Sequence, residues 1–251
     1  MIYLKRPQEI VRMREGGRVL AAVMEDVRKE IRAGVTAQQL DTLARRGIRA
    51  RRALPAQLGY RSYPASICVS PNEIVVHGIP DDRRLEDGDV VSIDFAIIYE
   101  GYYVDMARTY AVGAVSHEAQ HLIEATRASF FRGFDAARAG NRVGDISHAI
   151  EQYLRSAGLF AVRDFVGHGI GRSFHEEPDV PNVGEAGHGA PLRVGLTLAI
   201  EPMVTVREPQ VEILADGWTA STGDGNLAAH YENTVAITEE GPISLTEGAE
   251  A

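Results

Sequence analysis

An apolar stretch that carries two acidic residues places the strongest constraint on the fold. Residues 90–98 (VVSIDFAII) and 102–106 (YYVDM) flank Glu100-Gly101, and this pattern predicts a β-hairpin. Asp94 would lie on its first strand and Asp105 on its second. A carboxylate inside an apolar strand is costly to bury unless another group pairs with it. The hairpin therefore predicts acids that need positively charged partners.

Acids in apolar surroundings occur twice more along the chain. Glu201 follows the run LTLAI, and Glu232 lies within HYENTV. With His168 in GHGIG, these residues make a set of four carboxylates and one imidazole, which suits a pair of hard-to-borderline divalent metal ions. Two like charges 4 Å apart repel by about 4 kcal/mol at an effective dielectric of 20, so converging carboxylates need cations or protons. Any one of these acids alone also fits a surface salt bridge, and only the whole set indicates a metal site.

Length and charge restrict the class of protein. A chain of 251 residues can bury a large core, and one domain spanning 1–251 is expected. The formal net charge of −9 argues against DNA or RNA as the main partner. One basic cluster stands at the end of a predicted helix, and we interpret it as a solvated face, with an RNA-contacting patch as the alternative. The cluster consists of Arg45, Arg46, Arg49, Arg51 and Arg52.

Cysteine content and hydropathy indicate the compartment. The single cysteine, Cys68, excludes an internal disulfide and favours a reducing environment. No stretch reaches the roughly 18 apolar residues of a membrane helix, and the first residues lack the apolar core of a signal peptide. We therefore expect a cytoplasmic protein without a membrane partner.

Four helices are expected around segments of strand and loop. A helical pattern opens at Pro7 and runs to Gly34, and Thr36 with Gln39 forms a capping-box signature for the next helix. Ser116 is expected to cap a long helix that ends at Gly140.

The second half of the chain repeats the order of the first. A shorter helix is expected at 144–157, strands and loops follow from 165 to near 245, and the tail from Thr246 is expected to be disordered. Helices followed by strands with acids thus occur twice, which hints at two related halves, although no residue-level repeat supports it. The pattern predicts an α+β domain with an antiparallel central sheet.

Eight short motifs resemble those of the methionine aminopeptidases, in their short bacterial type I form. The resemblance extends over nearly the whole chain, from Glu9 to about Thr238, and eight motifs in the same order are far more specific than one. The motifs are Ser66-Ile67-Cys68-Val69-Ser70, Val76-His77-Gly78-Ile79-Pro80, Ser92-Ile93-Asp94, Asp105-Met106-Ala107-Arg108-Thr109, Gly167-His168-Gly169-Ile170-Gly171, Phe174-His175-Glu176-Glu177-Pro178, Ile200-Glu201-Pro202-Met203 and Tyr231-Glu232-Asn233-Thr234.

The resemblance implies a fold and a metal centre. The fold would be the pita-bread fold of creatinases and aminopeptidases, with two pseudo-symmetric halves and a central antiparallel sheet flanked by helices. Asp94 would bind one divalent ion, His168 and Glu201 the other, and Asp105 and Glu232 would bridge both. Cobalt, manganese, iron(II) and zinc all fit a ligand set of oxygens with one imidazole. A monomer is the family expectation.

The resemblance also implies a reaction. The chain would remove the initiator methionine from nascent proteins and peptides whose second residue is small, by attack of a metal-activated water. Glu201 would accept and shuttle the proton, His175 would stabilise the developing oxyanion, and His77 would hydrogen-bond the scissile amide region. A loop histidine satisfied by its neighbours is the alternative for His77. The basic cluster could contact the ribosome.

Five residues correspond to the family's methionine pocket, and each aromatic among them would otherwise be read as core. A thioether is favoured at aromatic edges by about 0.3–1.5 kcal/mol. At Gln57 the family usually carries a small, thiol or apolar residue, so an amide there is expected to reshape the pocket rim. The pocket residues are Tyr60, Tyr63, Cys68, Phe174 and Trp218.

Five further histidines have no role in the predicted site. His230, beside Glu232, could support the metal site from behind or be exposed, and exposure is favoured. The remaining histidines, His117, His121, His148 and His188, are expected at the surface.

A proline-specific peptidase or creatinase is the alternative enzyme, although such proteins usually carry an extra N-terminal domain. A non-enzymatic relative is disfavoured because all five ligand positions hold an acid or a histidine.

Overall fold

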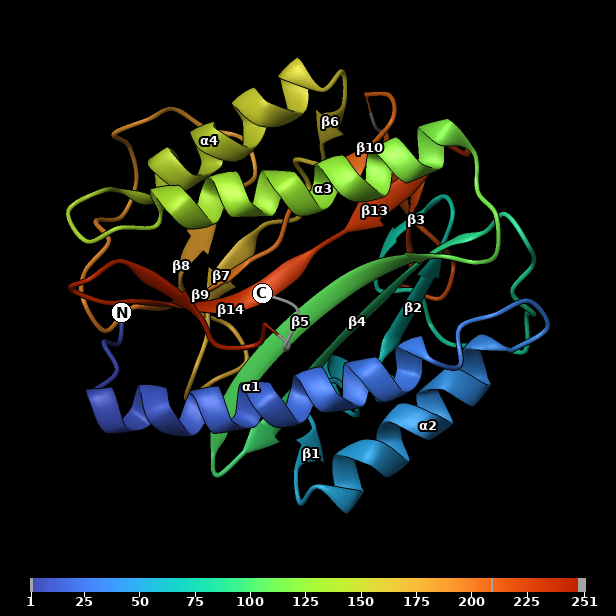
Figure 1. Ribbon diagram of the computed structural model, residues 1–251, viewed down its shortest axis with the longest axis horizontal. Helices are drawn as coiled ribbons and strands as arrows, with labels where there is room; N and C mark the ends of the chain where they lie inside the picture. Colours follow the sequence, from blue (N-terminus) through green and yellow to red (C-terminus); the bar gives the residue numbers. More distant parts are fainter. Residues whose placement is uncertain (1, 209, 248–251) are drawn as a thin grey trace.

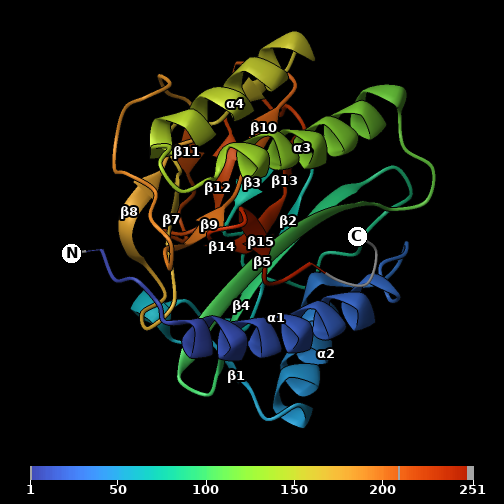
Figure 2. The ribbon, with the colours of Figure 1, turned by 60° about the vertical axis from the view of Figure 1, so that its left-hand side comes forward.

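The computed structural model describes residues 2–208 and 210–247. Four α-helices lie in this part of the chain: α1 (Pro7–Arg28), α2 (Ala37–Ala50), α3 (His117–Ala136) and α4 (Val143–Ser156). A short 3-10 turn, η1, spans Tyr60–Ser62. Both views of the ribbon show α1 and α2 along one half of the sheet and α3 and α4 along the other (Figures 1 and 2).

The strands of the described chain form one large sheet and two small ones. They are β1 (Leu54–Pro55), β2 (Cys68–Pro71), β3 (Ile74–Val76), β4 (Val90–Tyr99), β5 (Tyr102–Ala111), β6 (Phe160–Ala161), β7 (Gly167–Gly169), β8 (Glu176–Val180), β9 (Thr197–Ile200), β10 (Met203–Thr205), β11 (Val211–Ile213), β12 (Ala220–Thr222), β13 (Ala228–His230), β14 (Glu232–Ile237) and β15 (Pro242–Ser244). The large sheet has the order β1-β4-β5-β14-β9-β7-β8, with β2 also on β4 and β15 also on β14. Its pairs are antiparallel, which confirms the α+β prediction.

The predicted hairpin is confirmed, and its register orients the two aspartates. Glu100 (φ 47°) and Gly101 (φ 83°) are both left-handed, as a two-residue turn of type I′ requires. Asp94 pairs with Ala107, and Ala96 pairs with Asp105. Paired residues and residues two apart on a strand share a face, so both carboxylates point to the same side of the sheet.

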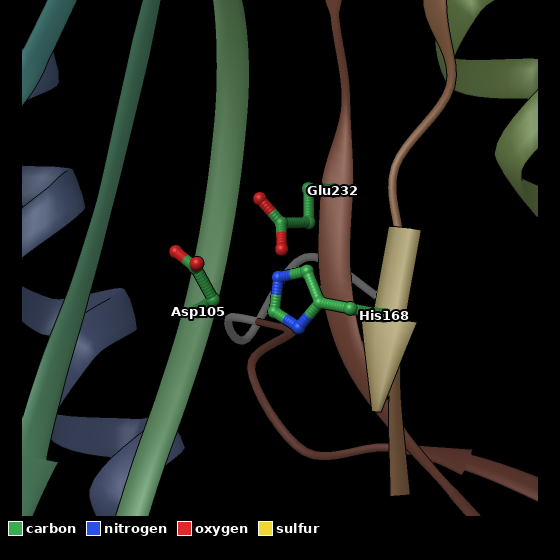
Figure 3. Close-up of side chains that lie close together, drawn as sticks. All are labelled: Asp105, His168 and Glu232. Carbon is green, nitrogen blue, oxygen red and sulfur yellow. The ribbon is translucent and has the colours of Figure 1, made fainter. Parts of the chain in front are cut away.

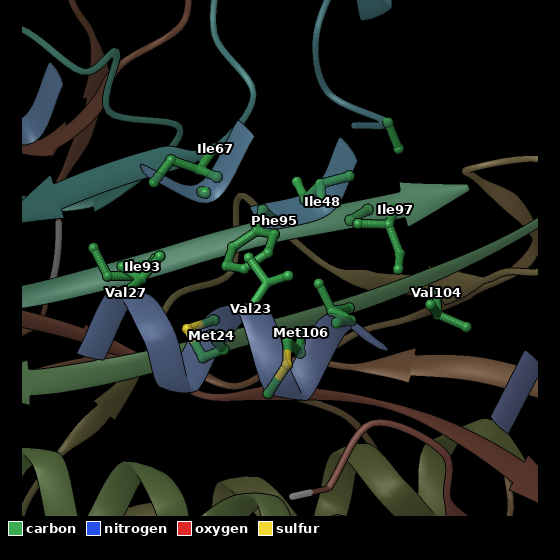
Figure 4. Close-up of a cluster of buried hydrophobic side chains, with 14 of the residues drawn as sticks. Val23, Met24, Val27, Ile48, Ile67, Ile93, Phe95, Ile97, Val104 and Met106 are labelled. Atoms are coloured by element: carbon green, nitrogen blue, oxygen red, sulfur yellow. The ribbon is translucent and has the colours of Figure 1, made fainter. Parts of the chain in front are cut away.

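The opposite face of this hairpin packs on the helices. Phe95 and Met106 pair across the strands and lie against Val23 and Met24 of α1, where all four side chains are buried (Figure 4). Burying such a side chain contributes about 1.5–3 kcal/mol. Alternation along β4 therefore fixes which face is core, and the same alternation sends Asp94 away from the helices.

Helix starts match the expectations better than helix ends. Thr36 Oγ1 accepts from the Gln39 amide at 3.2 Å, the Gln39 side chain accepts from the Thr36 amide, and Ser116 caps α3. The first helix, however, ends at Arg28 rather than near Gly34, whose amide instead donates to Leu85 O. The segment that follows the helix is thus held by a residue 51 positions beyond Gly34, a contact that local periodicity cannot show.

The third helix also ends earlier than the glycine signal suggests. It stops at Ala136, four residues before Gly140. The side chain of Asn141 folds back and donates to the carbonyl of Ala136 at 2.8 Å, and the Gly140 amide donates to Leu192 O. The fourth helix begins and ends within one residue of its predicted bounds.

The expectation of a disordered tail is wrong at its first residue. Thr246 is fully buried, accepts from the Thr234 amide at 3.0 Å and donates to Asn233 Oδ1 at 2.9 Å. These bonds attach the chain to β14, which sequence composition alone does not reveal. The remaining tail, 248–251, lies outside the described residues.

The basic cluster lies on the second half of α2 and just beyond its end. Arg46, Arg49 and Arg52 are exposed, and Arg51 donates to Asp26 of α1 at 2.8 Å. This arrangement agrees with a solvated face. None of the described helices is both long enough and apolar enough to pass through a lipid bilayer.

Candidate metal centre and substrate pocket

The five predicted ligands converge on one cavity of about 270 Å³. Asp94 comes from β4, Asp105 from β5, His168 from β7 and Glu232 from the start of β14, while Glu201 follows β9 directly. Figure 3 shows Asp105, His168 and Glu232 pointing toward one another from three strands. One donor atom of each of these three lies within 4.8 Å of the others, a spacing that could hold a metal ion.

A second group of the same kind adjoins the first. It consists of Glu201, His230 and Glu232, again with donor atoms within 4.8 Å of one another. Glu232 belongs to both groups, as a bridging carboxylate would. Asp94 lines the same cavity but belongs to neither group.

Glycines bring the strand that carries His168 close to its neighbours. A Cβ atom on Gly167 would lie 2.4 Å from Ala199 O, and one on Gly169 would lie 2.3 Å from Glu177 O. Only glycine allows the backbones to approach this closely. The ring of His168 is then held by a hydrogen bond between Nδ1 and Gly169 O at 2.8 Å.

This hydrogen bond decides which nitrogen of His168 can bind a metal. A carbonyl can only accept, so Nδ1 carries the proton and Nε2 offers its lone pair to the cavity. Burial, and next the neighbouring His175, lower the pKa of His168 to about 3, so the ring is neutral at physiological pH. Neutral imidazole is the form that binds metal ions.

The acids of the cavity are held where a charge without a partner is unfavourable. Burial raises the pKa of Asp94 to about 7. Burial, and then repulsion between neighbouring carboxylates, raises the pKa of Asp105, Glu201 and Glu232 well above the usual range. Asp105 Oδ1 and Glu232 Oε1 are buried without a hydrogen-bond partner among the described residues. Divalent cations would supply the missing partner, so this donor set fits them.

The raised pKa values predict a pH effect on the metal-free protein. Above pH 7 histidines are neutral in both the folded and the unfolded chain, whereas Asp105, Glu201 and Glu232, whose pKa values burial raises well above the usual range, keep protons when folded that they lose when unfolded. The folded state therefore binds more protons, and its free energy of unfolding falls as the pH rises. We expect the Tm of chelator-treated protein to fall by several degrees between pH 7 and pH 9. Protein supplied with Mn²⁺ should show a much smaller fall, and equal falls in both samples would contradict the assignment.

The predicted methionine pocket opens from the same cavity. Its walls include the five predicted pocket residues, and pairs of them meet edge to face: Tyr60 with Phe174 at 5.0 Å and Tyr63 with Trp218 at 5.1 Å between ring centroids. Burial raises the pKa of the Cys68 thiol, which agrees with a pocket wall rather than a nucleophile.

Gln57 lies in the wall of this cavity with its amide already oriented. It is 6% exposed, and its Oε1 accepts from the Ala96 amide of β4 at 2.8 Å. The side chain therefore fastens the wall to the strand that carries Asp94. The effect on the pocket rim that the sequence suggests stays a prediction.

Both predicted substrate-binding histidines line the cavity as well. His175 Nδ1 is 2.9 Å from Tyr60 OH, and its ring centroid is 4.1 Å from that of His168. His77 has a left-handed backbone (φ 61°) and packs edge to face on Phe165. Burial lowers the pKa of each to about 4, so both are neutral and can donate hydrogen bonds.

The expectation that His230 is exposed is wrong. The residue is 1% exposed and lines the cavity shared by the five predicted ligands, whereas none of the other unassigned histidines in the described chain does. His230 and Glu232 are two residues apart on either side of a strand junction, and this spacing favours a shared face. That signal was available in the sequence. Of the others, His148 is half-buried and His117, His121 and His188 are exposed, as expected.

Comparisons with known proteins identify the family of the chain. Residues 11–239 match the model of metallopeptidase family M24. The chain is 48% identical over 246 residues to a methionine aminopeptidase of Clostridium perfringens, covering 98% of this chain and 99% of the relative. It is 44% identical over 246 residues to methionine aminopeptidase 1 of Bacillus subtilis, with the same coverage.

Solved structures place the fold in the same group. A crystal structure of methionine aminopeptidase from Rickettsia prowazekii superposes with a TM-score of 0.97 at 36% identity, covering 98% of this chain and all of that one. An Xaa-Pro dipeptidase from Bacillus anthracis shares only the fold, with a TM-score of 0.78 at 22% identity, and this chain covers 63% of it. Matches along almost the entire chain, around a cavity rich in carboxylates, show that the protein belongs to metallopeptidase family M24 and has its pita-bread fold.

Proposed function

We propose that this chain is a methionyl aminopeptidase, a metal-dependent hydrolase that removes the N-terminal methionine from peptides and nascent proteins whose second residue is small. The observation that carries the proposal is one cavity that holds both acids without partners and an aromatic pocket. Relatives over nearly the full length are named methionine aminopeptidases, which supports the same reaction.

The acids and His168 would hold two divalent ions. Asp94 would bind the first ion, His168 and Glu201 the second, and Asp105 and Glu232 would bridge them. The oxygen-rich set with one neutral imidazole suits cobalt, manganese, iron(II) or zinc. When bound, such ions supply Lewis acidity and a water that ionises near neutral pH.

The chain's own residues would position the substrate and move the proton. Glu201 would take the proton of the attacking water and pass it to the leaving amine. His175, neutral and oriented by Tyr60, would donate to the oxygen on which charge develops. His77, which lines the same cavity, would donate to the scissile amide region. The methionine side chain would lie among Tyr63, Trp218 and the other pocket walls.

One assay tests the function directly. Purified protein is incubated with Met-Ala-Ser and with Leu-Ala-Ser, each with and without a chelator. We expect fast release of methionine, much slower release of leucine, and loss of both with the chelator, because the pocket is lined by aromatic edges and the carboxylates need cations. Equal release of leucine, or activity that survives chelation, would refute the proposal.

A ribosome contact at the basic cluster is a separate proposal. Changing Arg46 and Arg49 to alanine should reduce co-sedimentation with ribosomes, because exposed arginines pair with RNA phosphates. A control that changes the exposed Arg14 and Arg193 alters the net charge equally at other places. Unaltered co-sedimentation of the first variant would remove this proposal and leave the peptidase proposal intact. A cytoplasmic location agrees with such a role and rests on the single buried cysteine.

A further inference from the structure

We propose that His230 is a positioning residue that donates a hydrogen bond from Nε2 to Glu201 and so holds this carboxylate in its metal-binding orientation. The inference rests on the proposed metal site. It adds a residue that lies outside the five predicted ligands.

The imidazole of His230 is buried without the hydrogen bonds that its nitrogens could make. Nδ1 and Nε2 of His230 are both buried and have no hydrogen-bond partner among the described residues. Nε2 lies 3.8 Å from Glu201 Oε2 and 3.9 Å from Glu232 Oε2. Buried polar atoms are nearly always paired, so a nitrogen that faces two carboxylates calls for a role.

Hydrogen bonds hold the backbone of His230 in place, and this orients its ring. The Thr109 hydroxyl accepts from the His230 amide and donates to its carbonyl, both at 2.8 Å. His230 is the last residue of β13, which pairs with β10, and it lies opposite Met203. A small rotation of the Glu201 side chain would bring Oε2 within the 2.7–3.2 Å of a normal hydrogen bond.

The two oxygens of Glu201 face different imidazoles, which separates their roles. Oε1 lies 3.5 Å from His168 Nε2, the nitrogen that the bond to Gly169 leaves free for a metal. Oε2 is left facing His230. Carboxylates that bind metals usually accept a hydrogen bond from a residue that is not itself a ligand, and this bond orients them.

His230 is better suited to this role than to metal binding. A ligating histidine almost always donates its second ring N–H to an acceptor, as His168 does. Nδ1 of His230 has no such acceptor in the described structure. The tautomer with its proton on Nε2 therefore agrees better with the surroundings, and it presents a donor rather than a lone pair to Glu201.

The test compares two substitutions of the full chain. His230→Gln retains an N–H donor at about the position of Nε2, whereas His230→Leu has a similar volume and no donor. Affinity for Co²⁺ is measured by calorimetry, and the visible absorption of bound Co²⁺ reports its ligands. We expect a 10- to 100-fold weaker affinity for the leucine variant and a change below about threefold, with an unaltered spectrum, for the glutamine variant.

Other results of the Co²⁺ measurements would contradict the proposed role of His230. A leucine variant that binds Co²⁺ as tightly as the unaltered chain would overturn the inference. So would a glutamine variant as weak as the leucine variant with a changed spectrum, because His230 would then be a ligand. If the leucine variant does not fold, His230→Asn replaces it, since its amide is one carbon shorter and cannot reach Glu201. Absence of Co²⁺ binding by the unaltered chain would overturn the proposed function itself.

Discussion

Replacing Asp94 by asparagine should lower kcat/KM for Met-Ala-Ser by about 100- to 1000-fold, which corresponds to about 2.7–4 kcal/mol of lost transition-state stabilisation. Asparagine has nearly the same shape but no charge, so it would bind a cation poorly. The Tm of the metal-free protein should stay level or rise, because the substitution removes an acid whose pKa burial raises to about 7. Initial rates, metal content and thermal melts together check this result.

The matched control for this variant is Asp82→Asn, since Asp82 is exposed and lies outside the cavity. It should leave both kcat/KM and metal content unchanged. Near-normal turnover of Asp94→Asn with full metal content would show that Asp94 is not a ligand. A large fall in Tm would instead indicate a structural role for the carboxylate.

Replacing His175 by alanine should lower kcat by about 100- to 1000-fold and change KM much less. Loss of one donor to a developing oxyanion has an effect of this size. The ring of His175 lies against that of His168, yet it is not among the predicted ligands, so the metal content should stay the same. Steady-state kinetics over a range of Met-Ala-Ser concentrations separates kcat from KM, and elemental analysis measures the metal.

The exposed His117 at the start of α3 provides a control of the same residue type. His117→Ala should behave like the unaltered protein. A rise in KM with normal kcat in His175→Ala would mean that the residue only binds the substrate. Loss of metal from that variant would place His175 in the ion-binding set instead.

Much of the fold could be predicted because the decisive signals are local. Glu100-Gly101 permits the left-handed backbone of a two-residue turn, and the apolar runs on both sides of it predict the paired strands β4 and β5. The capping box at Thr36 is likewise contained in four residues. The ends of α1 and α3 could not be predicted in this way, since Leu85 and Leu192 accept hydrogen bonds from segments distant in sequence.

The sequence by itself determined which side chains could bind metal, and the hairpin that carries Asp94 on one strand and Asp105 on the other. Only the tertiary structure decided that Glu232, His168 and Glu201 join them, because β14 pairs with β5 and β9, and β9 pairs with β7. It also decided that the face shared by His230 and Glu232 is buried rather than exposed. The physical reason is that turns and alternation depend on neighbours in sequence, whereas burial and register depend on strands that meet only after the chain has folded.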